Sequence, residues 1–393
     1  MSQQVFADSI GKSKSWVDKV ERGVRRLDKF SVLNEIADSL TIDAQQLMGR
    51  DSTRRAEQVN CIDQVEVDSI RAALERYERL GRYLNAAPLE TTSIADLEKS
   101  VNHAWHAYEK ANYPELAHDL IALLKRAPMV EECVAEEQRP KAASLISQIY
   151  QIASTVLRKL GEPQLAWLAA DRAISAAQRC DDPLLIGTAT TRVANALRSL
   201  GRFQAALDIN IQVAHGMMAD IGQLKQADPA VLSVYGTLLL QGAMAASLAG
   251  EATTTKDLLR SASNAAERVG EGHNHYWTSF SPTNVQLHRV AAAVELGEGR
   301  LACQIHKTIS PQRFQQLVPE RRGHHYLDLA RGCAQSGDLD RAGNAIVMAD
   351  RSAAHEIRCR PLAHDIVSDL MRRSSGSVGP QVHRLARNMG IAA

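Results

Sequence analysis

Apolar residues recur at helical spacing along most of this chain, and a longer repeat is superimposed on that pattern. Five glycines, at positions 161, 201, 250, 297 and 337, each separate two amphipathic stretches. A compact side chain lies seven positions before each glycine (Ser154, Ala194, Ala243, Val290 and Ala330) and five positions after it (Ala166, Ala206, Thr255, Ala302 and Ala342). Compact side chains allow two helices to touch beside a glycine turn, so the sequence predicts a series of helical hairpins.

This arrangement is typical of tetratricopeptide (TPR) repeats. The glycines are 40, 49, 47 and 40 residues apart, longer than the roughly 34 residues of a standard TPR, so we expect extended helices or loops. A weaker unit is centred on Asn112, and a helix over 380–390 is expected to cap the array. The prediction for 93–393 is a right-handed α-solenoid whose concave face is lined by the first helix of each pair.

The N-terminal residues predict a separate pair of short helices. Ser2 is placed to cap a first helix with Val5, Phe6 and Ile10 facing inward, and Gly11 lies where a tight turn needs positive φ. Ser13 would cap a second helix over about 14–22, with a buried stripe of Trp16, Val17 and Val20. Two short helices joined by a tight turn, the second with a polar outer face, form the unit that enters a DNA major groove.

The segment 2–49 resembles the helix-turn-helix of the XRE family, the phage repressor and Cro type. The resemblance rests on the pattern S-Q-x-x-(apolar)-A-x-x-(apolar)-G-x-S-x-S-x-(apolar)-x-x-(apolar)-E-x-G, which residues 2 to 23 follow. It implies that Gln3 binds DNA phosphate, that the base edges are read by Lys14, Ser15, Asp18 and Lys19, and that further phosphates are bound by Arg22, Arg25 and Arg26. Between 11 and 30 the charge is +4, whereas the whole chain carries +1, so basic charge is concentrated in this segment.

Family members carry one more helix before this point, so the resemblance implies that residues 1–50 are a helix-turn-helix domain lacking its first helix. Residues 51–92 are expected to be a linker and a connecting helix. The linker is the polar stretch 50–60, and the connecting helix is expected over 66–84.

Composition narrows the class of protein. Hydrophobic residues make up 45% of the 393 residues but aromatic residues only 4%, which suits stacked helices and an all-α fold. With neither a long apolar run nor a signal-peptide pattern, we expect a cytoplasmic protein that does not contact a membrane. The six cysteines are scattered, and the nucleotide-loop and nucleophile-elbow motifs are absent. We therefore expect no enzyme activity, no cofactor and no metal.

The inner face of the predicted solenoid is polar. The groove is expected to include Arg198, His324 and Asp328, and the candidate ligand-binding residues on it are Arg158, Arg192, Asn195, Gln241, Asn284, His288 and Arg331. Amides can hold a peptide backbone and arginines can hold a carboxylate. The alternative is a solvated groove with no ligand.

The connection 270–289 adds Trp277 and Phe280 to the candidate ligand site, because aromatic rings beside convergent polar groups are typical of small-ligand sites. An equally good reading is that these aromatics fill a gap between repeats. His273 with His275, and His324 with His325, lack a third placed ligand, so metal binding is not expected there.

The whole layout resembles XRE-type regulators with a C-terminal TPR sensor, similar to the peptide-responsive quorum-sensing regulators of bacteria. The stretch YWTSFSPTNVQLHR at 276–289 is similar to one found in that group. The resemblance implies a homodimer that binds double-stranded DNA and senses a signal peptide or small-molecule effector. The competing hypothesis is a TPR scaffold that binds a partner's peptide and does not bind DNA.

Overall fold

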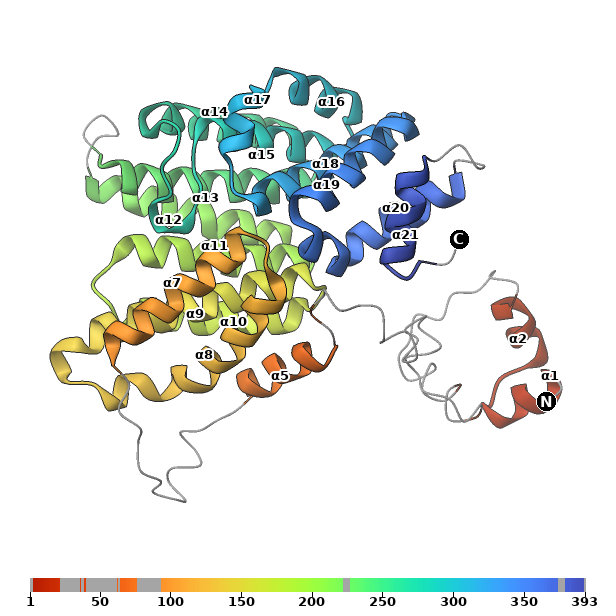
Figure 1. Ribbon diagram of the computed structural model, residues 1–393, viewed down its shortest axis with the longest axis horizontal. Coiled ribbons are helices and arrows are strands. Elements are labelled where there is room, and N and C mark those ends of the chain that lie inside the picture. Colours follow the sequence, from red (N-terminus) through yellow and green to blue (C-terminus); the bar gives the residue numbers. More distant parts are fainter. Residues whose placement is uncertain are drawn as a thin grey trace. The chain divides into compact units, whose positions relative to one another are not determined.

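The computed structural model describes residues 3–21, 64–75, 93–221, 227–373 and 379–391, with the isolated positions 36, 39 and 62 (Figure 1). All the regular structure in these segments is helical, so the predicted all-α class is confirmed for the described part of the chain. The chain divides into two compact units, Met1–Val59 and Asn60–Ala393, which are described separately.

The first unit contains α1 (Gln3–Ser9) and α2 (Lys14–Glu21). Gly11, in the turn between them, has φ of +61°. The Ser13 hydroxyl accepts a hydrogen bond from the Trp16 backbone N–H at 3.2 Å, so this serine caps α2 as its position predicts. The two helices pack through buried side chains that include Ala7, Ile10 and Val17.

Several sequence predictions lie outside the described residues. Arg22, Arg25, Arg26 and the linker 50–60 are among them, as is the side chain of Lys19. The predicted connecting helix is described only in part, as α5 (Gln64–Glu75).

The second unit is a succession of antiparallel helical pairs, each packed on the next (Figure 1). Its longer helices after α5 are α7 (Ile94–Glu109), α8 (Tyr113–Cys133), α9 (Arg139–Lys159), α10 (Pro163–Ala177), α11 (Pro183–Ser199), α12 (Phe203–Ile221), α13 (Pro229–Leu248), α14 (Ala252–Val269), α15 (Pro282–Glu295), α16 (Gly299–Thr308), α18 (Pro319–Gln335), α19 (Leu339–Cys359), α20 (Pro361–Arg373) and α21 (Pro380–Asn388). Shorter helical segments are η2 (Glu136–Gln138), η4 (His275–Trp277) and α17 (Pro311–Gln316).

The five repeat glycines lie at the turns inside five of these pairs, and each has a φ between +74° and +83°. Left-handed backbone of this kind costs glycine little because glycine has no Cβ. All ten compact residues that flank the glycines are at most 2% exposed. The pattern in the sequence therefore marks the places where the helices of a pair touch.

α5 packs against α8 and α10 and contributes Ile70 and Leu74 to their hydrophobic core. Arg71 of α5 forms a part-buried ion pair with Glu162 at 3.3 Å. The segment treated as a connecting helix in the sequence analysis thus packs as part of the second unit.

The beginning and the end of the second unit meet at a buried ionic cluster. Lys159, at the end of α9, contacts Glu320 of α18 and Glu356 of α19, the latter at 2.8 Å. Tyr108 of α7 donates a hydrogen bond to Glu320 at 3.0 Å, and Arg360 pairs with Glu356 at 2.9 Å. All five side chains are buried, so early and late helices enclose the space between them.

α13 is, within the described residues, the one helix long and apolar enough to cross a membrane. The sequence analysis did not single it out. The helix is 72% buried inside the second unit, which is the environment of a core helix.

Candidate ligand-binding cavity

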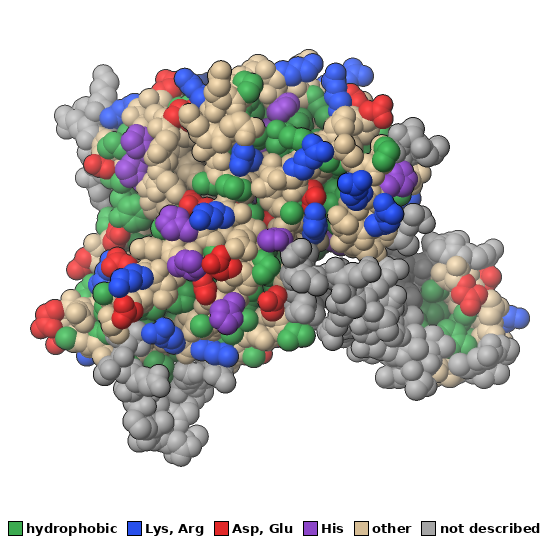
Figure 2. All heavy atoms as spheres, in the orientation of Figure 1, with side chains coloured by type: hydrophobic (Ala, Val, Ile, Leu, Met, Phe, Trp, Pro, Cys, Tyr) green, Lys and Arg blue, Asp and Glu red, His purple; other side chains and the backbone are tan. Residues whose placement is uncertain are grey.

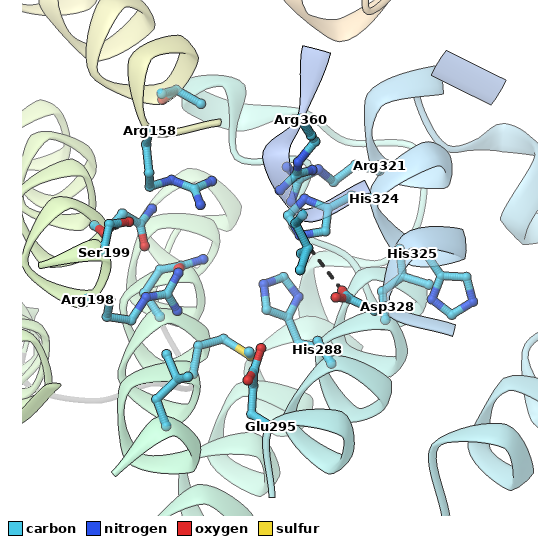
Figure 3. Close-up of a pocket in the computed structure, with 18 of the residues that line it drawn as sticks. Arg158, Arg198, Ser199, His288, Glu295, Arg321, His324, His325, Asp328 and Arg360 are labelled. Atoms are coloured by element: carbon cyan, nitrogen blue, oxygen red, sulfur yellow. Dashed lines mark hydrogen bonds and ion pairs between the residues drawn. The ribbon is translucent and has the colours of Figure 1, made fainter. Parts of the chain in front are cut away.

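The first helices of the pairs surround a cavity of about 300 Å³ (Figure 3). Its wall is built from α7, α9, α11, α13, α15 and α18, with Arg360 added from the end of α19 and Leu362 from the start of α20. Residues spaced three or four apart share one face of a helix. This spacing brings Asn284, His288 and Glu295 of α15 to the same wall.

Three of the six arginines on the wall are neutralised by carboxylates. Arg331 forms ion pairs with Glu295 at 2.7 Å and with Asp328 at 3.5 Å. Arg321 contacts its neighbour Glu320, and Arg360 pairs with Glu356. These pairs connect α15, α18 and α19, so they contribute to the structure of the wall.

The other three arginines, Arg158, Arg192 and Arg198, form no ion pair with any described carboxylate. The Nε atoms of all three, and Nη1 of Arg198, are buried without a hydrogen-bond acceptor. Arg192 lies over the ring of Trp105, 5.8 Å from its centroid. A cation–π contact of this kind leaves the in-plane N–H groups available to an anion.

Burial and mutual repulsion affect the acidity of these guanidinium groups. Burial is the main reason that the pKa of Arg198 is lowered to about 9, and repulsion from Arg158 is the second reason. Burial likewise lowers the pKa of Arg192 to about 10. Both side chains are cationic at neutral pH, so the cavity holds positive charge that the protein itself does not neutralise.

Two amide oxygens in the cavity wall lack hydrogen-bond donors. Asn195 Oδ1 and Asn284 Oδ1 are buried and unpartnered. Nearby, His288 Nδ1 donates to the carbonyl oxygen of Asn284 at 3.0 Å, and burial lowers the pKa of His288 to about 4. His288 is therefore neutral at pH 7, and its Nε2 is a hydrogen-bond acceptor.

Of the nine candidate ligand-binding residues, seven lie on this wall: Arg158, Arg192, Asn195, Gln241, Asn284, His288 and Arg331. Trp277 lines a smaller adjoining cavity of about 50 Å³, which shares Arg192, Asn284 and His288 with the larger one. Phe280 is 1% exposed and packs against Gly236 in the core, so it lies off both cavity walls.

Three arginines of the wall were not among the candidates. Arg198 follows Asn195 by three residues, so helical spacing already placed it in the groove. What marks it as a candidate ligand is that it has no carboxylate partner among the described residues, and the sequence does not show this. Arg321 precedes His324 by three residues on α18, so helical spacing could have placed it on the inner face as well. Arg360 lies outside the first helices and reaches the wall only through tertiary packing.

No family model, curated protein or solved structure matches this chain. The cavity is therefore interpreted from its own geometry. On the surface shown in Figure 2, acidic and basic side chains of the described residues are intermixed. The unneutralised positive charge of the cavity stands out against that mixed surface.

The connection between α14 and α15 covers one side of the groove. Trp277 stacks on Trp105 of α7 with ring centroids 5.6 Å apart, and the Tyr276 hydroxyl donates to Asp182 of the α11 cap at 2.9 Å. Tyr276, Trp277 and Ser279 all have φ between +49° and +58°. Non-glycine residues adopt this conformation at a cost, and such strain is found at binding sites.

Glu320, His324 and Glu356 lie close enough together to suggest a metal site. However, the Lys159 ammonium contacts both carboxylates. A buried ammonium between two carboxylates already supplies the positive charge that a metal ion would bring. We therefore interpret this cluster as structural.

In the first unit, the candidate DNA-contacting residues Lys14 and Ser15 are exposed on α2, and Asp18 is half-buried. Gln3, the candidate phosphate ligand, donates from Nε2 to Glu21 at 2.5 Å. The amide nitrogen carries two N–H groups, so this bond leaves one of them for a phosphate oxygen.

Proposed function

We propose that this protein is a ligand-responsive, sequence-specific DNA-binding regulator of transcription. The first unit would bind DNA through its helix-turn-helix, and the second, a TPR-like solenoid, would bind an effector. The observation that carries the proposal is the cavity, which gathers three arginines and two amide oxygens without partners onto one wall. Unpartnered polar groups gathered in this way favour a cavity that a ligand occupies.

The energetics of burial support a receptor role for the cavity. A buried charge or amide without a partner lowers stability, and the penalty disappears when a ligand supplies the partner. The amide oxygens of Asn195 and Asn284 meet this description, and so do the buried Nε atoms of the half-buried Arg158, Arg192 and Arg198. Unpaired groups held on helices rather than loops are also pre-organised for binding.

The size of the cavity favours an effector over a partner protein's tail. Small-ligand sites typically span about 300 to 1,000 Å³, and this cavity, at about 300 Å³, is at the lower end of that range. A scaffold that holds an extended tail needs an open groove along several repeats. Here the ionic cluster around Lys159 joins the two ends of the array.

DNA binding is supported by the resemblance to the XRE helix-turn-helix and by the local charge of +4 between residues 11 and 30. In the two described helices, Gly11 and the Ser13 cap are at the places that this motif needs. Paired heads in a homodimer would read two half-sites about one helical turn apart.

Selection of bound sequences from a random duplex library, followed by affinity measurements at several salt concentrations, tests this proposal. Counterion release makes the affinity fall steeply with salt, and three or four phosphate contacts in one head predict a loss of about 40- to 150-fold between 50 and 200 mM. The variant R25A/R26A should flatten this slope. If the full chain enriches no sequence and its affinity ignores salt, DNA binding is refuted.

A further inference from the structure

We infer that the cavity binds a compact organic anion that carries at least two negative charges and one or more hydroxyl groups, with Arg158, Arg192 and Arg198 as its anion ligands. The inference rests on the proposed function in taking the cavity as the effector site, and it adds the chemical class of the effector. It favours a small metabolite over a signal peptide.

Charge balance supports the anion. The wall carries six arginines, of which Arg321, Arg331 and Arg360 are paired with carboxylates. His288 is held neutral by burial, which lowers its pKa to about 4. Taken together, the four carboxylates Glu295, Glu320, Asp328 and Glu356 balance Arg321, Arg331, Arg360 and the neighbouring Lys159. The remaining three guanidinium groups leave a charge of about +3 facing the cavity, and a ligand with two or three negative charges would neutralise it.

Geometry supports the same class of ligand. In Figure 3, Arg158 and Arg198 extend from one side of the cavity, while His288 and Asp328 lie on the opposite side. Arg158 comes from the end of α9 and Arg198 from the end of α11, so two separate helices supply guanidinium groups. A guanidinium group donates two parallel N–H bonds to a carboxylate or a phosphate.

The unpartnered acceptors predict the rest of the ligand. Asn195 Oδ1 and Asn284 Oδ1 both lack a donor, and the Nε2 atom of His288 is a third acceptor because its Nδ1 donates to the backbone. Acceptors cannot bind a purely anionic ligand, which offers only acceptors itself. Hydroxyl groups beside the anionic groups would satisfy them.

A phosphate monoester and a polycarboxylate share this chemistry, and calorimetry with the full chain distinguishes them. The probes are ribose 5-phosphate, citrate, and neutral ribose as the uncharged reference. We expect at least one of the two anions to bind, and ribose to bind much more weakly.

The variants R158Q, R192Q and R198Q should each weaken binding of that anion about 10- to 100-fold, the effect of losing one charge-assisted hydrogen bond. The matched control is R260Q, because Arg260 is exposed on α14 and pairs with Asp257 at 2.7 Å. This control should bind the anion as the unmodified chain does.

Stability provides a second readout. Replacing a half-buried, unpaired arginine with glutamine should leave the Tm of the unliganded protein unchanged or raise it, because the desolvation penalty of the charge is removed. A lowered Tm for R158Q, R192Q and R198Q alike would show that these side chains stabilise the fold, and it would overturn the inference. Failure of both anions to bind, or undiminished binding to R158Q/R198Q, would overturn it as well.

The two experiments distinguish failure of the anion-binding inference from failure of the proposed regulatory function. If anions bind and require these arginines while no DNA sequence is enriched, the ligand class stands and the regulatory role fails. If DNA is bound specifically but a peptide or a neutral compound occupies the cavity equally well in R158Q/R198Q, the regulatory role stands and the ligand class is refuted.

Discussion

At the scale of the residue, burial decides the charge that each polar side chain in the cavity carries. His288 and His325 have pKa values lowered to about 4 and about 3 by burial, and the pKa of His324 is also lowered well below its usual value, for the same reason. Burial raises the pKa of Asp328 to about 6. At neutral pH the cavity therefore combines neutral histidines with charged arginines.

These shifts predict that the protein loses stability as the pH falls from about 6.5 to about 4. In that window the unfolded chain binds protons at the three histidines while the folded chain does not, so protonation favours unfolding. The Asp328 carboxyl has a raised pKa in the folded state, so its protonation stabilises the folded protein as the pH falls. With three groups against one, the free energy of unfolding should fall by roughly 1 to 3 kcal/mol per pH unit.

Urea unfolding at pH 7, 6 and 5 measures this effect. In H288Q the slope with pH should be smaller, by about one proton's contribution. A free energy of unfolding that stays constant or rises between pH 6.5 and 5 would show that these histidines do not have lowered pKa values.

At the scale of the element, the connection between α14 and α15 packs closely against α13. A Cβ atom on Gly236 would lie 2.0 Å from the Phe280 ring, so this glycine makes room for the ring. The Ser281 hydroxyl accepts from the Asn284 N–H at 3.2 Å and caps α15. Because Phe280 lies directly before the Ser281 cap, its packing against Gly236 fixes where α15 begins. The start of α15 in turn sets the positions of Asn284 and His288.

We predict that Gly236→Ala destabilises the protein by about 1 to 3 kcal/mol through overpacking and also weakens binding of the anion. The matched control is Gly216→Ala in α12, where a Cβ would meet no atom within 4 Å. That change should stabilise the protein slightly, by up to about 1 kcal/mol, because alanine is the better helix former. Chemical denaturation and calorimetry check both variants, and equal stabilities would contradict the predicted packing of Phe280.

At the scale of the whole molecule, the ionic cluster around Lys159 joins helices that are distant in sequence. Lys159 is fully buried and contacts Glu320 and Glu356, 161 and 197 residues further along. Burying these charges costs desolvation on folding, but removing Lys159 takes away the ammonium that contacts both carboxylates and leaves each of them with one arginine partner. Lys159 therefore connects α9 with α18 and α19, the helices on either side of the cavity.

We predict that Lys159→Met destabilises the second unit by about 3 to 5 kcal/mol and opens the cavity to solvent. Lys141→Met is the control, because Lys141 pairs with Glu98 on the surface with about half of each side chain exposed, and such pairs contribute about 1 kcal/mol or less. Hydrogen exchange should show lost protection in α9, α18 and α19 for the first variant only. Equal protection in both would mean that the cluster does not hold the two ends together.

The sequence by itself determined the local structure. Helical spacing, the glycines at the turns and the compact residues beside them follow from steric rules that act within one hairpin, so they could be predicted without a structure. The same spacing placed seven of the candidate residues, including Arg192 and Asn284, on the inner face, because each helix turns its own polar stripe in one direction.

Only the tertiary structure decided which charges are neutralised. The sequence places both Arg331 and Arg198 on the inner face of a first helix, yet the first meets Glu295 and the second meets no described carboxylate. The tertiary structure also placed Phe280 in the core instead of the cavity and brought Arg360 to the wall. These outcomes depend on the distance between side chains far apart in the chain, and distances of that kind are fixed only when the helices pack against one another.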